Sequence, residues 1–184
     1  MSEKDFESTR AMEQAFIDFA DSKGFAVGRH NGRESMAHLG LDSPARYDAE
    51  IWLRLHKVVF VDVKSVTAGN VDTGNGSISL GCLLHALKNT ETETYFVQYP
   101  GSDHEDAVGI VQGWTYGDAE WMLRQAKNRP CCGSCWGLFD QGLGVPRVCP
   151  NGSGDQPYLL YHLDGLKPID DLLFPNGEPP SESV

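Results

Sequence analysis

The stretch VVFVDVK, residues 58–64, is an apolar run of β-forming residues that holds an acid and a lysine two positions apart. Side chains alternate between the two faces of a strand, so Asp62 and Lys64 are expected to point the same way. Burying a carboxylate and an ammonium group is costly unless they pair, bind a metal or take part in chemistry. The stretch therefore predicts the buried central strand of a sheet and the position of a functional site.

The segments around this strand predict an α/β domain with a mixed central sheet flanked by helices. Apolar periodicity and turn residues indicate six elements in the order αβββαβ. These elements are a helix over 4–22, strands over 25–30, 46–55 and 58–66, a helix over 78–87 and a strand over 95–99. Ser77 is the expected N-cap of the second helix.

The C-terminal part is expected to add a strand over 108–112, a helix to 125 capped by Thr115 or Asp118, and a strand over 158–163. The chain then divides into four regions. They are an α/β core over 1–128, a cysteine-rich segment over 129–152, a strand and extension packed on the core over 153–174, and a disordered acidic tail over 175–184.

Composition and charge exclude several classes of protein. The formal charge of the 184 residues is −11, which argues against a broad basic surface for nucleic acid. No apolar run reaches the length of a membrane span, and the first residues, MSEKDFESTR, are acidic and polar rather than a signal peptide. We therefore expect a cytoplasmic protein with no membrane partner.

Two further acids accompany the pair in the central strand. Asp48 stands at the start of the preceding predicted strand, and Glu13 lies in the first predicted helix. With the segment Asp62-Val63-Lys64 and the αβββαβ order, they resemble the PD-(D/E)xK nuclease superfamily, which includes restriction enzymes, Holliday junction resolvases and phage exonucleases. The resemblance covers roughly residues 4–100 and implies a restriction-endonuclease-like core.

The resemblance also implies a role for each residue. Asp48 matches the Asp of the motif, Asp62 the D/E position and Lys64 the lysine. Glu13 matches the first-helix acid of some branches. The proline that names the motif is absent, because Tyr47 precedes Asp48.

The chemistry of phosphodiester cleavage asks for these residue types. It needs one or two hard cations, and carboxylates suit Mg²⁺ or Mn²⁺. Asp48 and Asp62 are the expected ligands, with the Val63 carbonyl as a third and Glu13 bound directly or through water. Lys64 would orient the attacking water or neutralise charge in the transition state. We therefore expect a metal-dependent endo- or exonuclease with nucleic acid, preferably DNA, as its partner, and a homodimer is compatible with it.

The turn before the central strand tests this interpretation. A two-residue turn at His56-Lys57 would send Asp48 to the face opposite Asp62. A three-residue loop would place Glu50 across from Asp62, and Asp48 across from Lys64. The nuclease interpretation therefore predicts an odd-length turn or a bulge, and it makes Glu50 an additional candidate ligand.

The cysteines predict a second metal site. Four of the five lie between 131 and 149, which favours metal ligation over a disulfide framework. The expected ligands of a structural zinc ion are Cys132, Cys135 and Cys149, with Cys131 or His162 as the fourth. An iron–sulfur cluster is the alternative. The fifth cysteine, Cys82, lies in an apolar helix and is expected in the core.

Two alternatives to an enzyme remain. The charge of −11 is compatible with a non-catalytic acidic protein whose carboxylates mimic phosphates and bind a nucleic-acid-binding partner. The chain could also be a degenerate nuclease fold retained as a binding or structural module. Convergence of Glu13, Asp48, Asp62 and Lys64 in one site is the observation that favours the enzyme.

Overall fold

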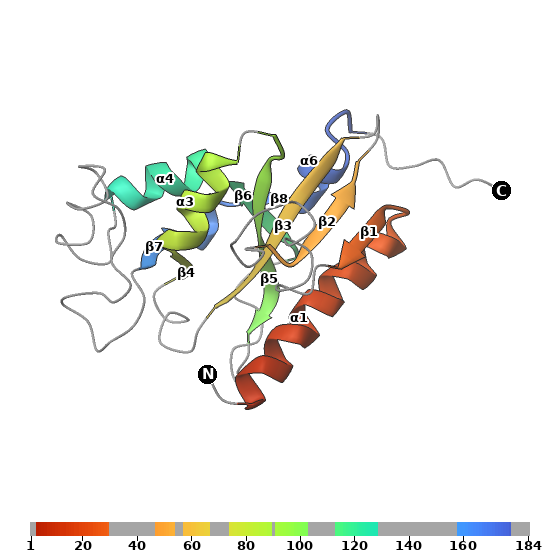
Figure 1. Ribbon diagram of the computed structural model, residues 1–184, viewed down its shortest axis with the longest axis horizontal. Helices are drawn as coiled ribbons and strands as arrows, with labels where there is room; N and C mark the ends of the chain where they lie inside the picture. Colours follow the sequence, from red (N-terminus) through yellow and green to blue (C-terminus); the bar gives the residue numbers. More distant parts are fainter. Residues whose placement is uncertain are drawn as a thin grey trace.

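The fold, described from a computed structural model, is an α/β arrangement in which helices flank a mixed six-stranded sheet (Figure 1). The structure describes residues 3–29, 47–53, 57–66, 74–89, 91–102, 113–128 and 158–177. In spatial order the strands are β1 (Ala26–Arg29), β2 (Ala49–Trp52), β3 (Val58–Val66), β5 (Thr94–Ser102), β6 (Thr115–Asp118) and β8 (Lys167–Pro168). A separate two-stranded sheet pairs β4 (Asn75–Ser79) with β7 (Tyr158–His162).

Strand β3 is the apolar run from which the fold was predicted, and its bounds are the expected ones. It pairs antiparallel with β2 on one side and parallel with β5 on the other. Both neighbours satisfy its backbone hydrogen bonds, so its side chains can be apolar on both faces of the sheet. The mixed sheet flanked by helices is therefore confirmed.

Two hydrophobic cores lie on the two faces of this sheet. The helices α1 (Glu3–Ser22) and α6 (Ile169–Leu173) cover one face, and α3 (Leu80–Lys88) and α4 (Ala119–Asn128) lie on the other with the β4–β7 sheet (Figure 1). Val61 and Val63 belong to the first core, whereas Phe96 belongs to the second. Since Asp62 pairs with Phe96 in the parallel ladder, Asp62 and Lys64 face the second core.

The predicted start of α3 is wrong. Ser77 lies inside β4, opposite Leu160 of β7, and the helix begins at Leu80. Its N-cap is Ser79, whose Oγ accepts a hydrogen bond from the Cys82 amide at 3.4 Å. Pairing with β7, which lies far away along the chain, extends the strand to this point. Local sequence gives no sign of such a distant partner.

The other predicted elements have mixed outcomes. Asp118 does cap α4, since its Oδ1 accepts the Trp121 amide at 2.6 Å, whereas Thr115 lies at the start of β6. The strand predicted over 108–112 and the tail from 178 onward lie outside the described residues. The short elements β8 and α6 were not predicted.

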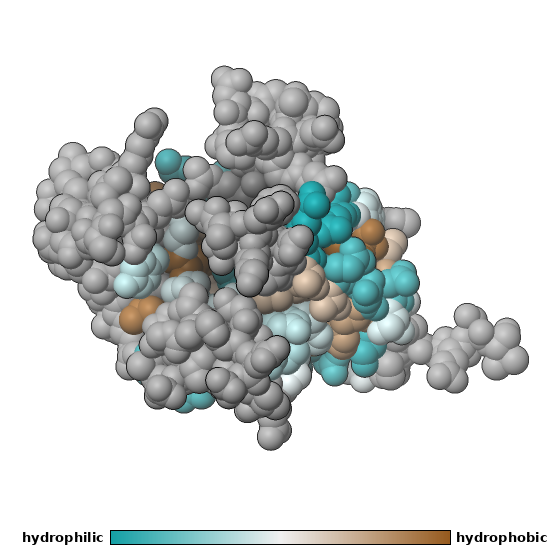
Figure 2. All heavy atoms as spheres, turned by 90° about the horizontal axis from the view of Figure 1, so that it is seen from below, coloured by the Kyte–Doolittle hydropathy of each residue, from teal (hydrophilic) through white to brown (hydrophobic). Residues whose placement is uncertain are grey.

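Few large apolar side chains are exposed among the described residues. Trp52 and Tyr158 are the large hydrophobic side chains that are most exposed, at 40% and 41%. On the face seen in Figure 2, small hydrophobic patches are interleaved with hydrophilic residues. Within the described ranges, no helix is long and apolar enough to cross a membrane.

Candidate functional site

The β2–β3 hairpin decides which acids meet. β2 ends at Trp52 and β3 begins at Val58, and the Leu53 amide donates to the Lys57 carbonyl at 2.7 Å, so an odd number of residues separates the opposed positions. This confirms the predicted odd-length turn. The ladder runs from Trp52 opposite Val58 to Ala49 opposite Val61, and Asp48 lies just before it, with its amide donating to the Val61 carbonyl. Asp48 is thereby close enough to Asp62 for the charge of Asp62 to raise its pKa.

The detailed register differs from the expected one by two residues. We expected Glu50 across from Asp62, but Glu50 pairs with Phe60 in β3 and with Gly28 in β1. Its Oε1 would lie 2.9 Å from a Cβ atom added at Gly28, so its carboxylate leans toward β1. The expected register, on which Glu50 was made a candidate ligand, is wrong.

Asp48 is tied to the backbone of β3. Its Oδ2 accepts a hydrogen bond from the Val63 amide at 2.6 Å, and its own amide donates to the Val61 carbonyl at 2.7 Å. The N–H and C=O of one strand residue point to the same edge, so the Val63 carbonyl also points toward Asp48. The carbonyl predicted as a ligand therefore lies at the same edge as the Asp48 carboxylate.

Asp62 and Lys64 form the ion pair that their spacing predicted. Lys64 Nζ lies 2.5 Å from Asp62 Oδ1, and the two side chains are 20% and 6% exposed. The second oxygen, Oδ2, is buried and has no hydrogen-bond partner among the described residues. A buried carboxylate oxygen without a partner is costly, so this atom is poised to accept a donor or a cation.

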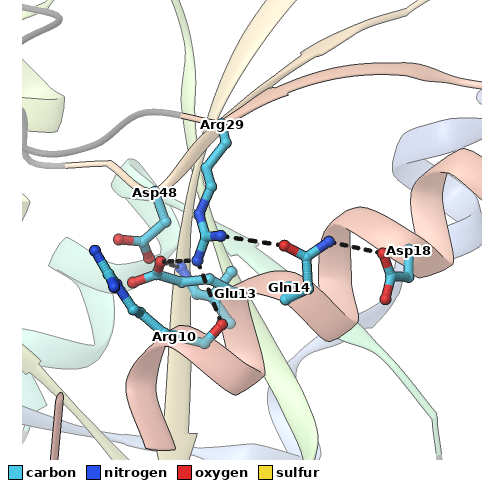
Figure 3. Close-up of polar contacts among 7 residues, drawn as sticks. Arg10, Glu13, Gln14, Asp18, Arg29 and Asp48 are labelled. Carbon is cyan, nitrogen blue, oxygen red and sulfur yellow. Dashed lines mark hydrogen bonds and ion pairs between the residues drawn. The ribbon is translucent and has the colours of Figure 1, made fainter. Parts of the chain in front are cut away.

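Glu13 projects from α1 toward Arg29 and Asp48 (Figure 3). Its Oε2 pairs with Arg29 Nη2 at 3.3 Å, and Arg29 also donates to Gln14 Oε1 at 3.1 Å and to the Arg10 carbonyl at 3.4 Å. Arg29 is the last residue of β1, so this set of contacts fastens α1 to the sheet beside Asp48. The structure thus places Glu13 beside Asp48 on the side of the sheet that α1 covers, whereas Asp62 and Lys64 face the second core.

The electrostatics of the site agree with this proximity. The pKa of Asp48 lies well above its ordinary value, mainly because the group is buried and then because Asp62 is negative. The charge of Glu13 raises it further, and Lys64 and the Val63 amide oppose the shift. Burial alone would lower the pKa of Lys64, but the negative charges around it, Asp62 first, raise it above the ordinary value.

The charges at the site balance. When all groups are ionised, three carboxylates (Glu13, Asp48 and Asp62) accompany three cations, Lys64, Arg29 and the Arg10 that lies beside Asp48 (Figure 3). Within the described ranges, no three His, Cys, Asp or Glu side chains are already placed to hold a metal. Glu13 is turned to Arg29, so the donors that fit a hard cation are Asp48, Asp62 Oδ2 and the Val63 carbonyl.

The predicted zinc site lies largely outside the described residues, which include none of the cysteines between 131 and 149. His162, the alternative fourth ligand, lies on β7 opposite Asn75. Cys82 is partly buried and packs against the second core, as its apolar surroundings predicted.

Sequence reasoning missed three residues of the site. Arg29 had no local signal that linked it to Glu13. Gln98 and Tyr161 are fully buried beside the Asp62–Lys64 pair and are hydrogen-bonded to each other at 2.8 Å. Gln98 could have been noticed, because it is a polar residue inside the apolar run 95–99, just as Asp62 is in its own run. Tyr161 gave no such signal.

No protein-family model and no curated protein matches the chain.

Proposed function

We propose that this protein is a metal-dependent nuclease that hydrolyses phosphodiester bonds in DNA, on a restriction-endonuclease-like core. One observation supports this most. Asp62 gives one oxygen to Lys64, its other oxygen is buried and without a partner in the described part of the chain, and the charge of Asp62 acts on the nearby Asp48. Two carboxylates and a lysine in this arrangement suit cleavage of an anionic phosphate ester.

The cation of this proposal is Mg²⁺ or Mn²⁺. Asp48, Asp62 Oδ2 and the Val63 carbonyl would hold it, with Glu13 reaching it through water. Bound there, it would supply Lewis acidity and a hydroxide nucleophile at neutral pH. The raised pKa of Asp48 fits such a role, because two neighbouring carboxylates without a cation favour the protonated form of one of them.

Lys64 would act as a fixed positive charge. Its raised pKa keeps the ammonium protonated at neutral pH, so it cannot be the general base. From its contact with Asp62 it would donate to the attacking water or to a phosphate oxygen, where negative charge grows in the transition state. Such a donor stabilises that charge strongly because its surroundings exclude water.

The acidic chain repels DNA overall, since its formal charge is −11. At the site itself three carboxylates and three cations balance, so one bound divalent cation would leave the site positive. Arg10 and Arg29 lie beside Asp48, where a phosphate backbone would pass (Figure 3). Binding of DNA is therefore expected to depend on the divalent cation more than it does for a basic protein.

A cleavage assay tests the proposal. Wild-type protein is incubated with duplex, single-stranded and branched DNA in Mg²⁺, Mn²⁺ or EDTA. We expect cation-dependent cleavage that falls by about a hundredfold or more in Asp62→Asn and Lys64→Ala. Asp164→Asn, a substitution at an exposed acid of the 3-10 turn Leu163–Gly165, is the matched control and should cleave normally. An inactive wild type on every substrate, or undiminished cleavage by both variants, contradicts the proposal.

The zinc prediction for residues 131–149 is kept as part of the proposal. Native mass spectrometry of the purified protein, together with its visible absorption spectrum, distinguishes a zinc ion from a coloured iron–sulfur cluster. Recovery of the fully reduced, metal-free chain under gentle conditions would contradict both.

A further inference from the structure

A buried polar link joins the β4–β7 sheet to the backbone of Lys64. Tyr161 of β7 donates its hydroxyl to Gln98 Oε1 at 2.8 Å, and both residues are 1% exposed. The Gln98 amide then donates from Nε2 to the Lys64 carbonyl at 3.0 Å and to the Tyr99 carbonyl at 3.3 Å. The link therefore uses the hydroxyl and both ends of the amide, and it ends on the main chain of the candidate catalytic lysine.

The link lies where the sheet loses its regular pairing. The parallel ladder pairs Lys64 with Gln98, but the next pair is Val66 with Ser102, so the register shifts just beyond the lysine. A shift of this kind leaves ladder groups without their usual partners. The side chain of Gln98 takes the Lys64 carbonyl instead, and holds β3 in place at the point where backbone pairing stops.

The direction of the hydrogen bonds is set by Tyr161. Burial raises the pKa of its hydroxyl, so it stays protonated and acts as a donor; Lys64 and Asp62 are both near enough to influence it. A donor on Oε1 leaves the Gln98 amino group to face the two carbonyls. The tyrosine ring is seated over Gly76, where an added Cβ atom would come within 2.3 Å of it. Glycine at this position thus permits the close approach of the ring.

We propose that Gln98 and Tyr161 are positioning residues that hold the backbone of Lys64 so that its ammonium group stays on Asp62. The inference rests on the proposed nuclease function for its effect on catalysis, but the placement of Lys64 can be measured without it. An apolar pair of the same shape would leave the Lys64 carbonyl without a donor at the point where the ladder stops. The polar pair therefore fixes the segment of backbone that carries the lysine.

Three variants test this. Tyr161→Phe keeps the ring over Gly76 and removes the hydroxyl. Gln98→Met with Tyr161→Phe replaces both partners by apolar groups and also removes the donor to the Lys64 carbonyl, so the link to the lysine backbone is lost entirely. Tyr116→Phe, at a buried tyrosine in the first core, is the matched control. The readouts are thermal unfolding, kcat and KM for DNA cleavage, and the contact between Lys64 Nζ and the Asp62 carboxylate in crystal structures of the wild type and the variants.

We expect kcat to fall about tenfold or more in Tyr161→Phe and in the double variant, with KM within about twofold. The fall should be present well below the unfolding temperature of each variant, and the Lys64 ammonium group should leave the Asp62 carboxylate in both. If kcat follows stability alone, or if the contact between Lys64 and Asp62 is unchanged, the inference is overturned. If the wild type cleaves nothing, the proposed function fails and the contact between Lys64 and Asp62 alone decides the inference.

Discussion

The Val63 amide, between Asp62 and Lys64 in β3, donates to Asp48 Oδ2 at 2.6 Å and holds the Asp48 carboxylate near that of Asp62. The position of the Asp48 carboxylate is therefore set by a hydrogen bond to the backbone rather than by a flexible side chain alone. Holding like charges in this way costs free energy in the absence of a counter-ion. Repulsion between the two carboxylates should therefore favour the binding of a cation beside them.

Replacing Asp48 by asparagine should stabilise the metal-free protein at neutral pH. The amide oxygen of the introduced side chain can still accept the Val63 amide, and the repulsion from Asp62 and Glu13 is lost, so we expect a gain of about 1 kcal/mol. Because the folded pKa is raised, the carboxyl group favours the fold below the ordinary value of 3.8, and this contribution is lost as pH rises through the folded pKa. The gain should therefore vanish at about pH 3 and grow toward neutrality.

Thermal unfolding in EDTA across this pH range measures the difference between the two proteins. In saturating Mg²⁺ the wild type should become more stable than Asp48→Asn, because the wild type binds the cation and the variant binds it weakly. A variant that is less stable than wild type at neutral pH in EDTA would contradict the argument.

Removing one charge of the Asp62–Lys64 pair should destabilise the fold more than removing both charges. Lys64→Met leaves a buried carboxylate with neither oxygen paired, and we expect a loss of about 3 kcal/mol in the free energy of unfolding at neutral pH. Adding Asp62→Asn should recover most of that loss. Denaturant unfolding of the two single variants and the double variant gives the coupling energy. Additive losses would show that the contact at 2.5 Å contributes little.

The acid limb of the activity profile should depend on cation concentration. Asp48 must be ionised to bind a cation, and its raised pKa places this step above the ordinary range of a carboxyl group. The cation competes with the proton, so raising Mg²⁺ should move the limb to lower pH. Initial rates between about pH 5 and 9 at several Mg²⁺ concentrations check this. If the acid limb does not move with the Mg²⁺ concentration, a group other than Asp48 causes it.

Removing Arg29 should act on Asp48 through Glu13. In Arg29→Gln the Glu13 carboxylate loses its cation, so its charge should raise the pKa of Asp48 further and shift the acid limb to higher pH. Glu13→Gln should shift it the other way. The pair is partly exposed, so either change should cost less than about 1 kcal/mol of stability. Equal shifts in the same direction would refute this linkage.

Much of the central sheet could be predicted because its signals are local. Alternation along a strand follows from backbone geometry, so the apolar run over 58–66 identified a buried strand with Asp62 and Lys64 on one face. Stripes of apolar residues identified α1 within one residue of each end. The start of α3 could not be predicted in the same way, because β4 exists only through its pairing with β7.

The sequence by itself determined which strand is buried, which acids are costly to bury, and that Asp62 and Lys64 point the same way. These depend on burial and on the period of one strand. The tertiary structure decided that Asp48 lies near Asp62 while Glu50 pairs with Phe60, that Glu13 is held by Arg29, and that Tyr161 and Gln98 reach Lys64. Those relationships depend on turn length and on contacts between segments far apart along the chain, which local periodicity does not encode.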